Sequence, residues 1–274
     1  MEITGNALIV GGASGIGMAC ALTLARDGAA GIMIADLDLA AARAVASKCE
    51  QIAKSPTFRA EATHVDVTDE GSVKAAAASM ASILGRIDYC IHCAGIAQPD
   101  HAHVADSDLS ELRRELEVNT AGTFLVLREV ATIMKAQELQ EIPSLLGDAR
   151  GATRGVIVVL GSASSYVATP GRGMYTTSKH AVMGLVKSAA IDHIQDGIRV
   201  NAVCPSWVNT PMLQQATGAN PELEELIRTL VPISRIASAE EVADVVAFLC
   251  SPRSSYMVGC GVIVDGGTTL TGRV

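Results

Sequence analysis

Short apolar runs alternate with longer segments of helical periodicity along the whole chain. Seven runs have the length and β-branched content of buried strands: residues 7–10, 32–35, 63–67, 89–93, 156–160, 199–203 and 262–264. The segments between them place apolar residues at helical spacing: residues 16–26, 39–51, 70–84, 109–118, 120–135, 175–194 and 239–250. This alternation predicts an α/β fold, in which right-handed crossovers build a doubly wound, seven-stranded parallel sheet with helices on both faces.

Composition supports one large domain with a buried sheet. Of the 274 residues, 49% are hydrophobic and only 18% are charged, as expected for strands covered on both faces. No linker, repeat or low-complexity tract divides the chain, so residues 1–274 are predicted to form a single domain. Residues 136–154 are polar and predict a surface insertion. Residues 206–236 contain several prolines and predict a mobile flap beyond the carboxyl end of a strand, where open α/β sheets bind ligands.

Charge and cysteine content exclude several classes of protein. The net charge is 21 − 29 = −8 and aromatic residues are 3%, so a nucleic-acid partner is not expected. Seven cysteines without regular spacing indicate reduced thiols. Residues 7–25 contain no charged residue and are nearly long enough to cross a bilayer, but glycines interrupt the apolar run. The residues before them lack the positive charge of a signal peptide. We therefore expect no membrane span, no targeting segment and a cytoplasmic location.

A glycine-rich turn follows the first predicted strand. The segment Gly11-Gly12-Ala13-Ser14-Gly15-Ile16-Gly17 opens directly into a predicted helix. Glycines permit a tight turn there and let the backbone N–H groups of a helix N-terminus approach a diphosphate. An ordinary strand-to-helix turn is the alternative, but the strand-turn-helix-strand context favours a dinucleotide site.

An acidic residue closes the second predicted strand. Asp36 lies nineteen residues beyond Gly17, near the spacing at which a carboxylate accepts the adenine-ribose hydroxyls of NAD. Asp36 could instead cap the following helix, although Asp38 is better placed for that role. A 2′-phosphate beside Asp36 would be repelled, and no Arg or Lys follows to offset the repulsion. The sequence therefore favours NAD over NADP.

A tyrosine, a lysine and a serine suggest proton transfer. Tyr175 and Lys179 are four residues apart and share one helix face, where the ammonium favours the phenolate. Tyr175 can then act as a general base towards an alcohol and as a general acid in the reverse direction. Ser162 follows the fifth predicted strand and can hold the substrate oxygen. The alternatives are that Tyr175 and Lys179 are only surface neighbours and that Ser162, Ser164 or Ser165 is a turn hydroxyl.

The Tyr-x-x-x-Lys motif at 175–179, with Ser162 thirteen residues upstream, resembles the classical short-chain dehydrogenase/reductase family. The resemblance extends over essentially the whole chain, through the glycine-rich turn, Asn119 and the segments 66–67, 93–95 and 199–205. It implies a single-domain Rossmann fold and an oxidoreductase that interconverts a secondary alcohol and its ketone by hydride transfer. It also implies a homotetramer, or a dimer, built on the helices that begin near Thr120 and Tyr175.

The resemblance assigns roles to particular residues. The catalytic group comprises Asn119, Ser162, Tyr175 and Lys179, in which the Asn119 side chain holds a water that links Lys179 to solvent and Lys179 also binds the nicotinamide ribose. Asn119 could instead interrupt a helix and make local backbone bonds. The implied NAD contacts are Gly11, Ser14, Gly15, Ile16, Gly17, Asp36, Leu37, Asp66, Val67, Ala94, Gly95, Tyr175, Lys179, Pro205, Val208 and Thr210.

The chain departs from the family pattern at three positions. Gly11 stands where Thr is common, Cys93 where Asn usually precedes Ala-Gly, and Ser206 where Gly usually follows the proline. Cys93 puts local rigidity beneath the cofactor in doubt. Cys90 and Cys93 together resemble a C-x-x-C metal motif, but residues three apart on a strand point to opposite faces, so no metal site is expected.

The predicted flap gives the evidence on substrate. Its apolar residues favour an apolar, ring-bearing alcohol of the steroid, terpenoid or polyketide kind found in secondary metabolism, with Ser164, Trp207 and Met212 as expected contacts, while its glutamates disfavour an anion. The same apolar residues could simply pack the flap against the domain, and Trp207 could anchor it. Two other functions stay open: a cofactor-binding regulator or scaffold without turnover, and an isomerase or cyclase that retains the nucleotide.

Overall fold

The computed structural model describes residues 3–97, 102–144, 147, 150–217 and 221–271. Its main sheet has seven parallel strands in the order β3-β2-β1-β4-β7-β8-β9. The strands are β1 (Asn6–Val10), β2 (Gly31–Asp36), β3 (Arg59–His64), β4 (Tyr89–His92), β7 (Gly155–Leu160), β8 (Ile198–Pro205) and β9 (Gly261–Val264). The predicted doubly wound α/β fold is confirmed.

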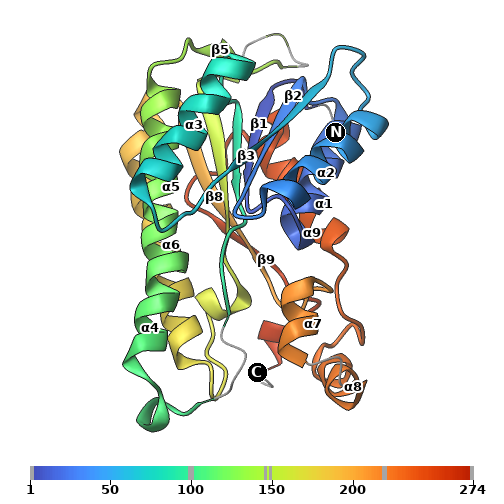
Figure 1. Ribbon diagram of the computed structural model, residues 1–274, viewed down its shortest axis with the longest axis vertical. Helices are drawn as coiled ribbons and strands as arrows, with labels where there is room; N and C mark the ends of the chain where they lie inside the picture. The colour runs from blue at the N-terminus through green and yellow to red at the C-terminus, as the bar shows by residue number, and fades with distance from the viewer. Residues whose placement is uncertain (1–2, 98–101, 145–146, 148–149, 218–220, 272–274) are drawn as a thin grey trace.

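Helices cover both faces of this sheet (Figure 1). One layer contains α1 (Gly15–Asp27), α2 (Leu39–Ile52) and α9 (Ala239–Cys250), and the other contains α3 (Glu70–Leu84), α5 (Gly122–Lys135) and α6 (Gly173–His193). Successive strand residues serve opposite cores, since Ile9 packs under the first layer and Leu8 under the second. Almost every residue of the central strands is therefore buried, which explains their near-continuous apolar runs.

The ends of β1 and β4 meet where the strand order reverses, the usual ligand crevice of such sheets. The backbone N–H groups of Cys93 and Ala94 both donate to the Val10 carbonyl oxygen, at 2.7 and 3.1 Å. Gly11 has a φ of +77°, and a Cβ there would lie 2.5 Å from the Ala94 nitrogen. Only glycine fits this approach at position 11.

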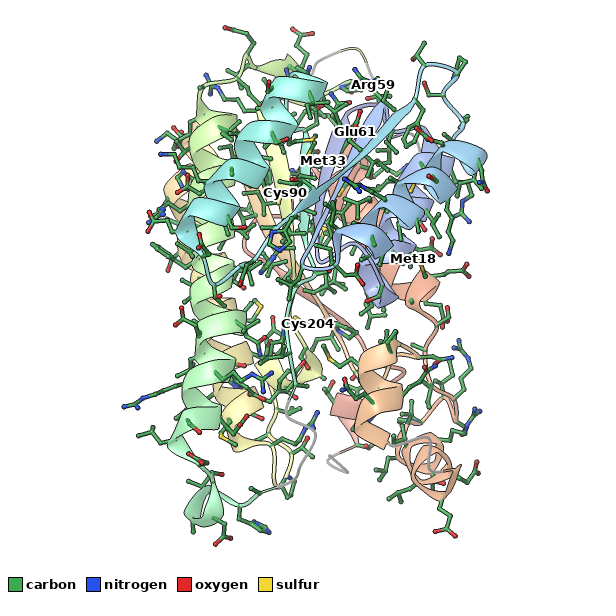
Figure 2. The ribbon with its side chains drawn as sticks, in the orientation of Figure 1. Met18, Met33, Arg59, Glu61, Cys90 and Cys204 are labelled. Atoms are coloured by element: carbon green, nitrogen blue, oxygen red, sulfur yellow. The ribbon has the colours of Figure 1, made fainter. Side chains whose placement is uncertain are left out.

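The third strand lies earlier than predicted. The sequence predicts residues 63–67, whereas β3 spans Arg59–His64. Among the strands that the structure describes, β3 lies at the edge and pairs with β2 alone, and it carries an exposed Arg59–Glu61 ion pair at 3.3 Å (Figure 2). Edge strands commonly carry charges. The apolar Val65 and Val67, on which the prediction rested, are buried just beyond the strand.

The predicted helices at 109–118 and 120–135 form one continuous rod. Helix α4 (Leu109–Glu115) passes into a π-helical turn, Leu116–Ala121, and then into α5 without a break. Asn119 therefore does not interrupt the helix; it lies within the wider turn, a feature often found at functional sites.

The two irregular segments carry short elements. In the insertion, β5 (Gln140–Glu141) pairs antiparallel with β6 (Ala152–Thr153). The flap, residues 206–236, holds α7 (Pro211–Thr217) and α8 (Pro221–Leu230), which lie beyond the carboxyl ends of the strands, across from α4 (Figure 1). Short 3-10 turns occupy Val104–Asp106, Ala163–Ser165, Ile194–Asp196, Pro252–Ser254 and Thr268–Leu270. Within the described ranges, no helix has the length and hydropathy required to cross a bilayer.

Two helical glycines give a matched test of this packing. A Cβ at Gly17 would overlap the Gly11 carbonyl oxygen, whereas a Cβ at Gly184 on α6 would meet nothing within 4 Å. Gly17→Ala should therefore lower the free energy of unfolding by about 1–3 kcal/mol through overpacking. Gly184→Ala should raise it by up to about 1 kcal/mol because alanine favours helix. Urea unfolding would measure both, and shifts in the same direction would contradict the close approach at Gly17.

Candidate functional site

The Lys179 ammonium is buried at the carboxyl edge of the sheet. The residue is 7% exposed, and its Nζ donates to the carbonyl oxygen of Leu160, the last residue of β7, at 2.9 Å. A methyl group on Gly95 would lie 3.7 Å from this Nζ and 3.0 Å from Asn119 Oδ1. Helix α6, strand β7 and the loop after β4 thus enclose one positive charge.

Tyr175 lies one helical turn before Lys179. The Lys179 Nζ is 5.8 Å from the centroid of the phenol ring, within the range at which a cation is attracted to an aromatic face. The ring is half-buried. The structure thus places Tyr175 beside a buried Lys179 ammonium, and the two are not merely surface neighbours.

Ser162 stands on the tight turn that leaves β7. Its Oγ accepts a hydrogen bond from the Ser164 N–H at 3.1 Å, while the Ser165 Oγ accepts from the Ser162 N–H at 3.2 Å. This reciprocal cap fixes the turn. Because the Ser162 oxygen acts as the acceptor, its own hydrogen can be donated to a substrate oxygen. Ser165, which is buried, therefore shares the turn with Ser162.

The Asn119 side chain is a structural bridge, which rules out the alternative of local backbone bonds. Its Oδ1 accepts from the Ile96 N–H at 2.8 Å, and its Nδ2 donates to the Ile96 carbonyl at 2.9 Å and to Ser178 Oγ at 3.0 Å. Both amide hydrogens are thereby used in bonds within the protein. Its partners are also distant in sequence rather than local. Asn119 instead fastens the loop after β4 to the residue that precedes Lys179.

His92 is a buried neighbour of Asn119 and Lys179 that was not predicted from the sequence. It ends β4, and its Nε2 is hydrogen-bonded with Thr123 Oγ1 at 3.1 Å. Thr123 Oγ1 in turn donates to the Asn119 carbonyl at 2.6 Å. Burial, reinforced by the charge of Lys179, lowers the pKa of His92 to about 3, so the imidazole is neutral. A histidine closing an otherwise apolar strand was the available signal.

The glycine-rich turn presents a helix N-terminus that is open to an anion. Ser14 precedes α1 without a side-chain capping bond, and the first turn of α1 carries no acidic residue. Gly15 has a φ of +50°, and a Cβ there would lie 3.3 Å from Thr210, so the flap borders the turn. The backbone N–H groups of this turn fit a diphosphate.

Asp38 caps the following helix as predicted, whereas Asp36 is held by two backbone N–H groups. The Asp36 Oδ2 accepts from the Ala13 N–H at 2.9 Å, and its Oδ1 accepts from the Asp38 N–H at 3.1 Å. Asp38 caps α2 through the Ala41 N–H at 3.0 Å. The Asp36 carboxylate is thereby held beside the glycine-rich turn, with the side chain of Leu37 65% exposed next to it.

Several other expected cofactor contacts follow the carboxyl ends of β3 and β8. The Asp66 carboxylate accepts from the Thr68 hydroxyl and N–H, which lowers the pKa of Asp66, and Val67 is buried beside it. Pro205 ends β8, and Val208 is buried where the flap pairs with Ala237. Thr210 accepts from the Leu213 N–H at the start of α7.

Comparison with known proteins shows the family to which this chain belongs. Residues 11–269 match the family described as enoyl-(acyl carrier protein) reductase. The chain is 54% identical to short-chain dehydrogenase fogB of Aspergillus ruber, with 99% of each chain covered, and 51% identical to short-chain dehydrogenase srdC of Neurospora crassa over the full length of both. This chain belongs to the short-chain dehydrogenase/reductase family. The crystal structure of levodione reductase superposes with a TM-score of 0.86 at 29% identity, covering 99% of this chain and 100% of the other.

Family membership makes the chain an oxidoreductase of the short-chain dehydrogenase/reductase type, a family that uses nicotinamide cofactors. The open helix N-terminus at Ser14 and the carboxylate of Asp36 beside it fit the diphosphate and ribose of such a cofactor. The geometry of the turn is thus consistent with the family.

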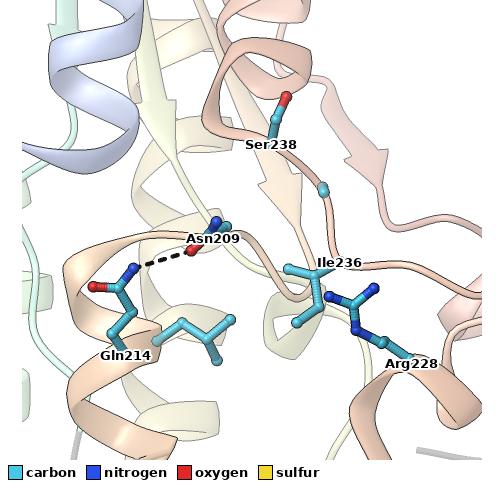
Figure 3. Close-up of a pocket in the computed structure, with 7 residues that line it drawn as sticks. Asn209, Gln214, Arg228, Ile236 and Ser238 are labelled. Carbon is cyan, nitrogen blue, oxygen red and sulfur yellow. Dashed lines mark hydrogen bonds between the residues drawn. The ribbon is translucent and has the colours of Figure 1, made fainter. Parts of the chain in front are cut away.

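The expected substrate contacts are less closely assembled. Ser164 and Trp207 are half-buried, and Met212 is 42% exposed. The Trp207 carbonyl accepts from the Ala237 N–H, so its backbone is held by the return of the flap. A cavity of about 160 Å³ lies elsewhere in the flap (Figure 3), and its lining residues are Asn209, Leu213, Gln214, Arg228, Ile236, Ala237 and Ser238. None of these is a predicted site residue.

Cys93 replaces the usual family Asn with a thiol that faces α1. Cys90 (Figure 2) lies in the core beneath α3 and α5, whereas Cys93 packs on the opposite face, so the two side chains point to opposite sides of the sheet as predicted. A hydrogen bond with Cys93, together with burial, raises the pKa of Cys20 on α1. The backbone bonds to Val10 tie β4 to β1 in this family member without the Asn side chain.

The neutral His92 makes stability depend on pH. The unfolded imidazole titrates near pH 6.5 and the folded one near 3, so the unfolded state binds more protons between these values. Stability therefore falls as pH drops below about 6.5, by about 2 kcal/mol between pH 7.5 and 5 from this group. His92→Gln should remove that part of the slope in urea unfolding. The exposed His64→Gln is the control, and equal slopes for wild type and His92→Gln would contradict the assignment.

Proposed function

We propose that this chain is an NAD-dependent oxidoreductase that interconverts a secondary alcohol and its ketone. The observation that carries the proposal is the pairing of Tyr175 with the buried Lys179 ammonium, at the sheet edge that also bears the glycine-rich turn. A bound nicotinamide dinucleotide supplies the hydride acceptor or donor. The diphosphate would rest on the N–H groups of residues 14–17.

The protein's residues would then manage the proton. In alcohol oxidation, with the cofactor as hydride acceptor, the Tyr175 oxygen would take the hydroxyl proton of the substrate. In ketone reduction Tyr175 returns that proton. The Ser162 hydroxyl donates to the substrate oxygen, and Lys179 keeps a positive charge near the phenolate. Asn119 positions Lys179 through its bond to Ser178.

The preference for NAD rests on Asp36. The cofactor's adenine ribose would meet a carboxylate that is already fixed by the Ala13 and Asp38 N–H groups. An added 2′-phosphate would face that charge at about 4 Å, where repulsion is of order 4 kcal/mol at an effective dielectric of about 20. A quarter of that repulsion is enough to discriminate between the two cofactors.

For the substrate we propose an apolar, ring-bearing alcohol or ketone of the kind found in secondary metabolism. Ile227 and Val231 of the flap are buried against the domain, so packing explains them, whereas Met212 and Leu226 stay 42% and 53% exposed. The exposed Glu222 and Glu225 disfavour an anionic substrate. The names of the fungal short-chain dehydrogenases and of levodione reductase are consistent with redox chemistry.

We further propose a cytoplasmic homotetramer, or a dimer, assembled through α5 and α6. Phe124 on α5 and Ile191 on α6 are 47% and 73% exposed, and both are apolar surface that a second copy would cover. The odd number of cysteines, all unpaired with one another, supports a reducing compartment.

Turnover of a panel of secondary alcohols, from small linear ones to sterols, tests the proposed reaction. With NAD the wild type should generate reduced-nicotinamide absorbance, more weakly with NADP. Tyr175→Phe should lower kcat at least about 100-fold, because it removes the proton acceptor, while NADH binding followed by fluorescence is retained.

Tyr256→Phe is the matched control, since Tyr256 is 101% exposed, and it should keep full activity. An active Tyr175→Phe enzyme would refute the role of the phenol. A wild type that binds NADH yet oxidises no alcohol and reduces no ketone of the panel would favour the non-redox functions instead.

A further inference from the structure

Arg172 places a second cation on the Tyr175 ring. Its guanidinium carbon lies 5.4 Å from the ring centroid, and the Lys179 Nζ lies 5.8 Å from the same point. Arg172 is three residues before Tyr175, and Lys179 is four residues after it, so both cations flank the tyrosine along one helix face. Both distances are within the roughly 6 Å at which a cation–π attraction operates.

The backbone of Arg172 is fixed from several directions. Its N–H donates to the Thr169 carbonyl at 3.1 Å, and its carbonyl accepts from the Thr176 N–H at 2.9 Å. It also forms an isolated parallel bridge with Ala102, in the segment that follows β4. The guanidinium therefore starts from a defined position at the N-terminus of α6, and the side chain is half-buried there.

A cation over the ring acts differently on the two forms of the phenol. The face of a neutral phenol carries a partial negative charge, and loss of the proton spreads a full negative charge into the ring. A guanidinium above the ring therefore stabilises the phenolate more than the phenol. Arg stays protonated throughout the pH range of activity, so this contribution is constant.

We propose that Arg172 is a positioning residue for Tyr175, holding the ring in place and adding to Lys179 a second positive charge that favours the phenolate. The proposal rests on the proposed role of Tyr175 as general acid and base. Arg172 touches the ring and is not assigned a contact with substrate.

Other charged groups around α6 are identical in all the variants compared. His92, the titratable group nearest Lys179 on β4, is neutral. The elements packed against α6 contribute these further charged side chains: Glu111, Arg113, Arg114 and Glu115 on α4; Glu117 on the π-helical turn; Arg128, Glu129 and Lys135 on α5; Arg199 on β8; and Asp196 in the 3-10 turn after α6. A change produced by substitution of Arg172 alone therefore reports on Arg172.

The test compares Arg172→Met, which keeps length and loses charge, with Arg172→Lys, which keeps charge. Arg128→Met is the matched control, because Arg128 lies 5.5 Å over the ring of Phe124 on α5, away from the site. Two quantities are measured for each protein: the pH profile of kcat/KM for alcohol oxidation, and the ultraviolet absorbance of tyrosinate against pH. Subtracting the titration of the same protein with Tyr175→Phe isolates the Tyr175 signal.

In Arg172→Met the rising limb of the pH profile and the Tyr175 titration should both move up by about 0.5–1 pH unit, so kcat/KM near neutrality falls about three- to tenfold and recovers at high pH. Arg172→Lys, which keeps the charge, should leave both measurements close to their wild-type values, and Arg128→Met should change neither measurement.

A uniform loss of kcat/KM with an unmoved Tyr175 titration in Arg172→Met would overturn the proposal and leave only a structural role. An unmoved titration with unchanged activity would overturn it as well. A shifted titration in a protein whose turnover is indifferent to Tyr175→Phe would support the interaction with Arg172 while refuting the proposed function.

Discussion

The buried ammonium of Lys179 sets the requirements that the surrounding structure meets. A charge that is only 7% exposed must be compensated by close acceptors, and the Leu160 carbonyl provides one at 2.9 Å. This bond joins helix α6 to the last residue of β7. Gly95 leaves space for the ammonium beside the loop after β4, because a methyl group there would lie 3.7 Å from it. Asn119 then fastens that loop to α6 through Ile96 and Ser178.

The close approach of β1 and β4 connects this charge to the nucleotide turn. Two N–H groups after β4 share the Val10 carbonyl, and the absence of a side chain at Gly11 allows the strands to end so near each other. The glycine-rich turn and the Tyr175–Lys179 pair consequently occupy one edge of one sheet. In the proposed function, this places hydride transfer and proton transfer on the same substrate carbon–oxygen bond.

The elements predicted well were those governed by burial on both sides. The central strands and the helices between them follow from apolar runs and helical spacing, and Asp38 follows from local capping. β3 was misplaced because an edge strand needs little apolar content, so the buried Val65 and Val67 beyond it gave the stronger signal. The partners of Asn119 and the importance of His92 depend on contacts between residues more than 20 positions apart, which spacing along the chain does not reveal.

The most direct test of the account is single-turnover hydride transfer in Lys179→Met, a variant that fills the same volume without the charge. Reduced-nicotinamide absorbance would be followed after mixing with NAD and a substrate turned over by the wild type, once unfolding experiments show that the variant is folded. We expect the rate of hydride transfer to fall at least about 100-fold, and a rise in pH to restore only part of it. A folded Lys179→Met protein that transfers hydride at the wild-type rate near neutral pH would contradict the central role given to the buried ammonium.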